Sequence, residues 1–188
     1  MDAALDLLAE RGDGVTLREL TDAADANVAA VSYHFGSLQS LCDAAIEQAL
    51  ERYLDAQQAA VSALGPESTV EELAAAFARP MISALTKKGR DRPVIRIVAR
   101  AGIDPPEGWN RFDARFDQIR AHVLQVLKPN LAGVRAPELI LRTRCVAGML
   151  NWLALAPVGA ELSDKSEKQA ERLLVPIVAG AFRGSNSD

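Results

Sequence analysis

The chain has 188 residues, of which 49% are hydrophobic and 24% are charged, and its formal net charge is −4. This length and composition suit one or two compact domains with a sizeable core, and they exclude an intrinsically disordered chain. Residues 1–50 hold two basic and nine acidic side chains, a formal charge of −7, so residues 51–188 carry +3.

The first elements of the chain are predicted to be two short helices. An amphipathic helix starts near Ala3 and is closed by Gly12. Thr16 then stands three residues before Glu19, a capping-box spacing that predicts a second helix from Leu17. One face of this helix is expected to carry its apolar residues Leu17, Leu20 and Ala24.

A turn and a third helix follow. Asp25, Ala26 and Asn27 tolerate turn conformations, and the next apolar residues recur at helical spacing. We expect Val28, Val31 and Phe35 to be buried against the preceding helix. The opposite side would then expose small and hydrogen-bonding side chains, namely Ala29, Ala30, Ser32, Tyr33 and His34.

Two short helices joined by a tight turn form the helix-turn-helix pattern. Its small residues, the YHF sequence and the following Gly36, Ser37 and Leu41 resemble the amino-terminal domain of TetR-family transcriptional regulators. The resemblance covers about the first quarter of the chain and implies an all-α fold. It implies a three-helix DNA-binding domain, here residues 1–46, and a larger effector-binding and dimerisation domain, here residues 47–188. A homodimer would bind a double-stranded DNA operator and release it when a small molecule binds.

The candidate DNA contacts lie on the second and third helices. Hydroxyl and imidazole groups, together with helix amino termini, can donate hydrogen bonds to phosphate oxygens, and asparagine, serine and alanine can contact base edges. The third helix contains no lysine or arginine, so phosphate contacts have to come from these weaker donors. The predicted set is Thr16, Arg18, Asn27, Ala29, Ala30, Ser32, Tyr33, His34 and Ser37.

Three positions depart from the pattern of the resembling family. Leu38 stands where a lysine is usual, and Asp25 replaces a usual glycine in the turn. Family members also have several residues, often basic, before the first helix, whereas this sequence begins at Met1. We hypothesise either that translation begins upstream of Met1 or that the protein binds DNA weakly.

The middle of the chain is also predicted to be helical. Ser37 caps a long helix from Leu38 to about Leu64. Thr69 and Glu72 repeat the capping-box spacing and open a further helix, in which Pro80 should cause a kink. A connector over residues 90–93 and a short helix over residues 94–101 follow, and that helix carries Arg96 and Arg100 on one face. These two arginines form either a solvated surface or a contact to an anionic ligand.

Three helices are expected in the last part of the chain. Asp104, Pro105 and Glu107 have the pattern of a helix start, Pro137 opens the next helix, and Ser163 or Asp164 caps the last. An aromatic stripe could line an effector pocket or belong to the plain core. Its residues and those predicted to face it are Phe77, Met81, Trp109, Phe112, Phe116, Met149 and Trp152.

The last two helices carry more apolar surface than one small domain needs to bury. A two-fold dimer would cover this surface as a four-helix bundle, as the resemblance implies. The alternative is that the two helices cover one another within one subunit. The predicted dimer contacts are Cys145, Met149, Leu153, Leu174, Ile177 and Ala181.

Catalysis has no support in the sequence. His34 and His122 lack metal-ligand spacing, and His122 is expected to face solvent. No nucleophile motif or phosphate-binding loop occurs, so we predict no enzyme activity, no catalytic or metal-ligating residue and no cofactor. A helical dimer that binds a ligand or a protein partner, with little or no specific DNA binding, remains the alternative function. The −7 charge of residues 1–50 favours it.

The compartment can be predicted from cysteine usage and hydropathy. Cys42 and Cys145 stand among apolar helical residues, so we expect two buried free thiols, which fits a reducing cytoplasm. The longest apolar stretch, around residues 145–158, is too short for a membrane span. We therefore expect a soluble cytoplasmic protein.

Overall fold

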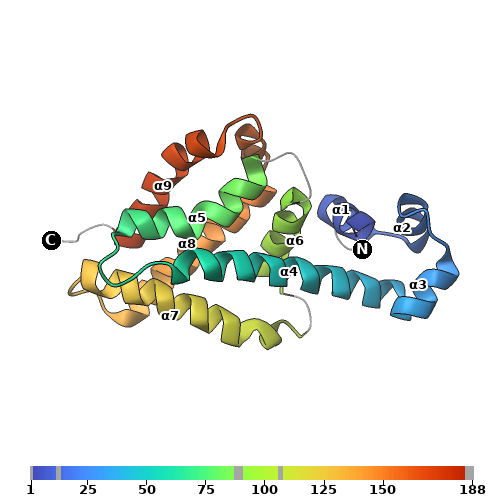
Figure 1. The fold of residues 1–188 in the computed structure, drawn as a ribbon, viewed down its shortest axis with the longest axis horizontal. Helices are drawn as coiled ribbons and strands as arrows, with labels where there is room; N and C mark the ends of the chain where they lie inside the picture. Colours follow the sequence, from blue (N-terminus) through green and yellow to red (C-terminus); the bar gives the residue numbers. More distant parts are fainter. Residues whose placement is uncertain (1, 12–13, 87–90, 106–107, 185–188) are drawn as a thin grey trace.

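A computed structural model describes residues 2–11, 14–86, 91–105 and 108–184. The regular elements of these ranges are all helices, which confirms the predicted all-α class. Three short helices form one end of the molecule, and a long fourth helix runs from them along the larger part (Figure 1). They are α1 (Asp2–Arg11), α2 (Leu17–Ala23), α3 (Val28–Phe35) and α4 (Leu38–Ser62).

The larger part is built around the carboxyl-terminal half of α4. Helix α5 packs on α9, α6 packs on α8, and α7 runs beside α4 (Figure 1). Two short 3₁₀ segments, η2 and η3, connect these helices. The elements are α5 (Val70–Thr86), α6 (Asp91–Ile103), η2 (Trp109–Phe112), α7 (Asp113–Asn130), α8 (Ala136–Leu155), η3 (Pro157–Leu162) and α9 (Glu167–Arg183).

The predicted capping motifs fix the starts of three helices. The N–H of Glu19 donates to the Thr16 hydroxyl, and the Glu19 carboxylate accepts from the Thr16 N–H, so α2 begins with a complete capping box. Thr69 and Glu72 form the same arrangement at α5. These hydrogen bonds from threonine lower the pKa of both glutamates. Ser37 accepts from the N–H of Ser40 at the start of α4.

Two predicted helix starts are wrong. Helix α6 begins at Asp91, not at residue 94, because Pro93 in its first turn has no N–H that needs a helical partner. Asp104 and Pro105 lie outside any helix, since η2 intervenes and α7 begins at Asp113. Glu107, which was part of that expected start, lies outside the described residues, as do Gly12 and Met1.

The expected cap of the last helix is also wrong. Ser166, not Ser163 or Asp164, caps α9 and forms a capping box with Gln169. Residues up to Leu162 are occupied by η3, which displaces the helix start. Pro80 lies inside α5 without splitting it.

Burial differs from the expected pattern at the amino-terminal end and on α8. Leu20 and Val31 are buried as expected, but Ala24 is exposed because it is the C-cap of α2. Val28 is 49% exposed because it opens α3 beyond the packed turn. Cys42 is buried as expected, whereas Cys145 is exposed on an outer face of α8. None of the helices in the described ranges is long and apolar enough to cross a membrane.

Candidate functional site

The outer face of α3 is exposed and uncharged. Tyr33 is 85% exposed, and its ring meets the ring of His34 edge-on with centroids 5.0 Å apart. Ala29, Ser32 and His34 are exposed as well, while Ala30 is half-buried. This face can donate hydrogen bonds and contact thymine methyl groups without bringing a positive charge.

Three of the predicted DNA contacts are helix caps. The Thr16 hydroxyl donates to the Glu19 carboxylate over 2.8 Å, so its hydrogen is already used. The Asn27 Oδ1 accepts from the N–H of Ala30 over 2.7 Å, which leaves the Nδ2 group available to a base. Ser37 shares a hydrogen bond with the Ser40 hydroxyl. These side chains fix the helix starts, and their remaining capacity for DNA is small.

The turn before α3 places an acid in an unusual conformation. Asp25 has a φ of 48°, in the left-handed region that favours glycine. This is the position where the resembling family usually has glycine. The single arginine of α2, Arg18, has a side chain that is 92% exposed and lies 3.9 Å from the Asp22 carboxylate. Arg18 is therefore the one predicted contact with a permanent cation that can reach a phosphate.

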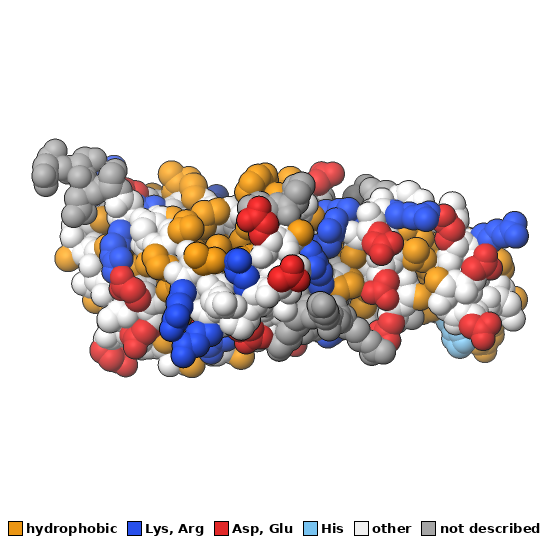
Figure 2. Space-filling view, turned by 90° about the horizontal axis from the view of Figure 1, so that it is seen from above, with side chains coloured by type: hydrophobic (Ala, Val, Ile, Leu, Met, Phe, Trp, Pro, Cys, Tyr) orange, Lys and Arg blue, Asp and Glu red, His pale blue; other side chains and the backbone are white. Residues whose placement is uncertain are grey.

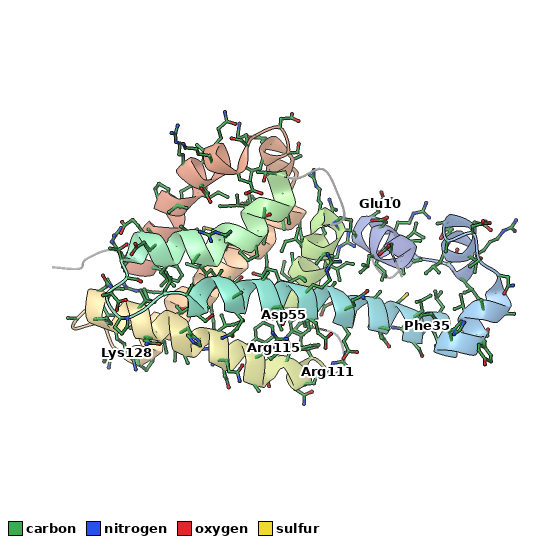
Figure 3. All side chains as sticks on the ribbon, in the orientation of Figure 1. Glu10, Phe35, Asp55, Arg111, Arg115 and Lys128 are labelled. Atoms are coloured by element: carbon green, nitrogen blue, oxygen red, sulfur yellow. The ribbon has the colours of Figure 1, made fainter. Side chains whose placement is uncertain are left out.

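Arginines compensate part of the acidity of residues 1–50. Arg11, which is already counted in the −7, pairs with Glu19 inside the domain, whereas Arg111 of η2 comes from outside these residues and pairs with Glu47 of α4 over 3.2 Å. A second bridge joins Arg115 of α7 to Asp55 of α4 over 2.6 Å (Figure 3). Figure 2 shows lysine and arginine side chains grouped where the two parts of the molecule meet. Of these pairs, the one between Arg111 and Glu47 compensates a carboxylate of residues 1–50.

Two arginines of α6 join the larger part to α1. Arg96 donates from Nε to the carbonyl of Ala9 over 3.1 Å, and Arg100 donates to the carbonyl of Leu8 over 2.6 Å. Both carbonyls belong to the last turn of α1, where they have no helical partner and where the helix dipole favours a cation. Burial lowers the pKa of Arg96 most, and the positive charges of Arg100 and Arg92 lower it further.

A cavity of about 440 Å³ lies between the helices of the larger part. Of the predicted pocket residues, Phe77, Trp109 and Phe116 line it, and Trp109 stacks on Phe116 with centroids 5.6 Å apart. Met81 and Phe112 are buried outside the lining, Met149 is half-buried and Trp152 is exposed. The complete lining is Leu50, Tyr53, Leu54, Gln57, Phe77, Val98, Gly102, Trp109, Phe116, Ile119, Arg144, Ala147, Gly148 and Asn151.

The polar groups of this cavity are not among the residues predicted from the sequence. Gln57 is 2% exposed and donates from Nε2 to the carbonyl of Phe77 over 3.0 Å. That carbonyl can only accept, so the amide nitrogen has to face it and Oε1 faces away. Gln57 Oε1 is buried without a hydrogen-bond partner among the described residues. Burial also raises the pKa of the neighbouring Tyr53.

The cavity face of α8 had a recognisable signal. Arg144, Ala147, Gly148 and Asn151 are spaced 3, 1 and 3 residues apart, so they lie on one face of α8. They place small and polar residues on a face of α8 that a plain core stripe would fill with large apolar side chains. His122, which was expected to face solvent, is half-buried and hydrogen-bonds the carbonyl of Gln118 over 2.9 Å.

Large apolar side chains remain exposed on α8 and α9. Leu141 and Trp152 of α8 are 61% and 60% exposed, and Leu173 and Ile177 of α9 are 51% and 55% exposed. Helices α8 and α9 pack on one another in part, and these four side chains remain uncovered within one subunit. Among the predicted dimer residues, Cys145 and Ile177 are exposed, and the half-buried ones are Met149, Leu153, Leu174 and Ala181.

The comparisons with known proteins bear on the amino-terminal end of the chain. Residues 1–45 match the family described as bacterial regulatory proteins, tetR family. Comparison with curated proteins finds no match. The matched segment contains α1, α2, α3 and the start of α4, and it includes the exposed face of α3. The amino-terminal end of the chain therefore matches the TetR family, as its helix-turn-helix pattern predicts.

Proposed function

We propose that this regulator is a homodimeric, ligand-responsive repressor that a small molecule releases from its operator. The observation that carries the proposal is the pair of hydrogen bonds from Arg96 and Arg100 to the last turn of α1. They belong to a helix that also lines the cavity. A molecule in the cavity can therefore change the position of the DNA-binding domain through one rigid element.

The geometry of α6 supports this coupling. Val98 and Gly102 line the cavity, while Arg96 and Arg100 hold α1. The two pairs are offset by two residues, which at 3.6 residues per turn places them about 200° apart around the helix. A shift of α6 away from an occupied cavity would therefore be passed directly to α1.

Helix α4 provides a second connection between the same two regions. Its first residues follow α3, and its residues Leu50, Tyr53, Leu54 and Gln57 line the cavity. Its 25 residues span about 37 Å at 1.5 Å per residue. In a dimer, small rotations of two such helices would change the separation of the two α3 helices, and operator half-sites are read at a fixed spacing.

The cavity lining supports a mostly apolar effector. Aromatic and aliphatic side chains supply most of its surface, as is usual for small-molecule sites. Leaving a buried acceptor such as Gln57 Oε1 unsatisfied costs about 1–3 kcal/mol. An effector with an N–H or O–H group at this point would remove that cost, so we expect the effector to carry a hydrogen-bond donor.

The exposed apolar face of α8 and α9 supports dimerisation. Leu141, Trp152, Leu173 and Ile177 would be covered by the same face of a second subunit in a two-fold dimer. Such a dimer would bring two α3 helices to one operator. We propose that it acts in the cytoplasm, where a regulator reaches DNA.

Two experiments test the proposal. Footprinting on the DNA beside the protein's own gene should reveal a protected site with two half-sites; no protected site even at low salt would overturn DNA-bound repression. A small-molecule library would then be screened for compounds that release the labelled site. Gly148→Leu should abolish release, because a Cβ at Gly148 meets no atom within 4 Å and the larger side chain can enter the cavity.

A matched substitution controls for nonspecific effects of added volume. Ala121→Leu places the same side chain on an exposed position of α7 that does not line the cavity, so release should be unchanged. Light scattering would establish that both variants keep the oligomeric state of the wild type. Equal release from wild type and Gly148→Leu would show that the compounds act elsewhere.

A second function is favoured by the charge of the amino-terminal part. The exposed face of α3 carries no lysine or arginine, and Asp25 is exposed in the turn that precedes it. These features favour a dimer that binds a ligand or a protein partner and has little specific affinity for DNA. The footprinting experiment separates the two functions.

A further inference from the structure

The described lining of the cavity carries a positive charge and no negative one. Within the described part of the chain, Arg144 is the one charged residue among the side chains that line the cavity, and no carboxylate lines it. Arg144 makes no ion pair or hydrogen bond with any of the residues that the structure describes. The exposed guanidinium of Arg144 is therefore available to pair with an acidic group at the edge of the apolar cavity.

Comparison with a neighbouring arginine shows that this is not a general property of α8. Arg142 pairs with Glu138 over 2.5 Å and donates to the carbonyl of Phe182 over 3.1 Å, so it holds α8 to the end of α9. The residues at the helical neighbour positions of Arg144 are all uncharged, and none of their side chains can accept a hydrogen bond from its guanidinium; they are Ile140, Leu141, Ala147 and Gly148. Arg144 is exposed, while its position on α8 borders the cavity.

We propose that the effector is an amphipathic organic anion whose apolar body fills the cavity and whose acidic group pairs with Arg144. This inference rests on the proposed function of the cavity as the effector site. A guanidinium offers two parallel N–H donors that match a carboxylate, sulfonate or phosphate group. A cationic ligand would find no counter-charge in the described lining and would meet the charge of Arg144. The cavity therefore selects anions among apolar molecules.

A pair of fluorescent probes that differ in one group tests this inference directly. 1-Anilinonaphthalene-8-sulfonate carries a sulfonate, and N-phenyl-1-naphthylamine has the same rings without it. Fluorescence titration of the full-length protein without DNA measures the affinity of both. We expect the anion to bind the wild type about two- to fivefold more tightly than the neutral probe, which is the range expected for an ion pair with an exposed arginine.

Substitutions then assign the preference to the arginine. Arg144→Gln should weaken binding of the sulfonate probe about two- to fivefold and leave binding of the neutral probe unchanged, and Arg144→Lys should restore part of the loss. Arg135→Gln is the matched control, because Arg135 is an exposed arginine at the start of α8 that does not line the cavity. Gly148→Leu should reduce binding of both probes. Ile177→Arg, which lies outside the lining, should reduce neither, and this distinguishes the cavity from the exposed apolar face of α8 and α9.

The outcomes separate the inference from the proposal on which it rests. Equal binding of the two probes, with both weakened by Gly148→Leu and neither by Arg144→Gln, would overturn the anion preference and leave the cavity as an effector site. Binding that Gly148→Leu does not affect, or no binding of either probe, would count against both. A preference for the anion that persists in Arg144→Gln would also overturn the inference.

Discussion

The hydrogen bonds between α6 and α1 predict that removing two arginine side chains lowers the stability of the protein measurably. Replacing Arg100 by alanine removes the 2.6 Å hydrogen bond to the carbonyl of Leu8, and replacing Arg96 removes the 3.1 Å bond to Ala9. Hydrogen bonds that involve a charged group contribute about 1.5–3 kcal/mol to stability. Because both arginines are partly exposed, we expect each of these bonds to contribute about 1–2 kcal/mol. Each single loss is offset in part, because the positive charges of Arg96 and Arg100 repel one another.

The double variant Arg96→Ala/Arg100→Ala should therefore lose about 2–3 kcal/mol of unfolding free energy. A chain of this size loses roughly 2–4 °C of melting temperature per kcal/mol, so calorimetry should show a decrease of about 4–12 °C. Hydrogen exchange should increase more in α1 than in α9, because the lost bonds hold α1 alone. Arg172→Ala, at an exposed position of α9, is the control. An unchanged melting temperature with unchanged exchange in α1 would refute the proposed joint.

Three further outcomes are expected. Asp25→Gly should raise stability by about 0.5 kcal/mol, measured by thermal unfolding, and strengthen DNA binding in a titration, because it relieves the positive φ and removes a negative charge. The pKa values of Glu19 and Glu72 are lowered from 4.5, so their stabilising contribution is complete above pH 4.5 and is lost below it, which circular dichroism during acid titration would detect. Ile177→Arg should reduce the mass seen by light scattering from a dimer to 20.2 kDa.

Each of these outcomes has a result that would contradict it. Weaker DNA binding by Asp25→Gly would mean that the aspartate itself takes part in recognition. Loss of helix that begins well above pH 4.5 would point to other groups than the capping glutamates. A dimer that survives Ile177→Arg would place the subunit interface elsewhere than on α8 and α9.

Local motifs made the first half of the fold predictable from sequence. Capping boxes such as Thr16 with Glu19 act within four residues, so their geometry follows from spacing alone. The same motif at Ser166 and Gln169 was overlooked, although its spacing is identical. The start of α7 was not predictable in this way, because η2 forms where the rings of Trp109 and Phe112 pack 6.0 Å apart.

The cavity and the joint depend on tertiary structure. Gln57 reads as an ordinary polar residue of a long helix, and its role appears only because α5 presents the carbonyl of Phe77 to it. Arg96 and Arg100 are predicted to share one face of a helix, but the carbonyls of α1 that accept their hydrogen bonds lie 87 and 92 positions earlier. Spacing shows which residues share a face, whereas the partner of that face comes from the packing of distant helices.

The most direct test of the account is a fluorescence anisotropy titration of the protein with the DNA beside its own gene, repeated over a range of salt concentrations. We expect specific binding. The logarithm of its association constant should fall only gently with the logarithm of the salt concentration, because α3 carries no lysine or arginine. Tyr33→Ala/His34→Ala should abolish that specific binding, since both exposed side chains lie on the outer face of α3. Equal binding to unrelated DNA, or none at low salt, would contradict the account.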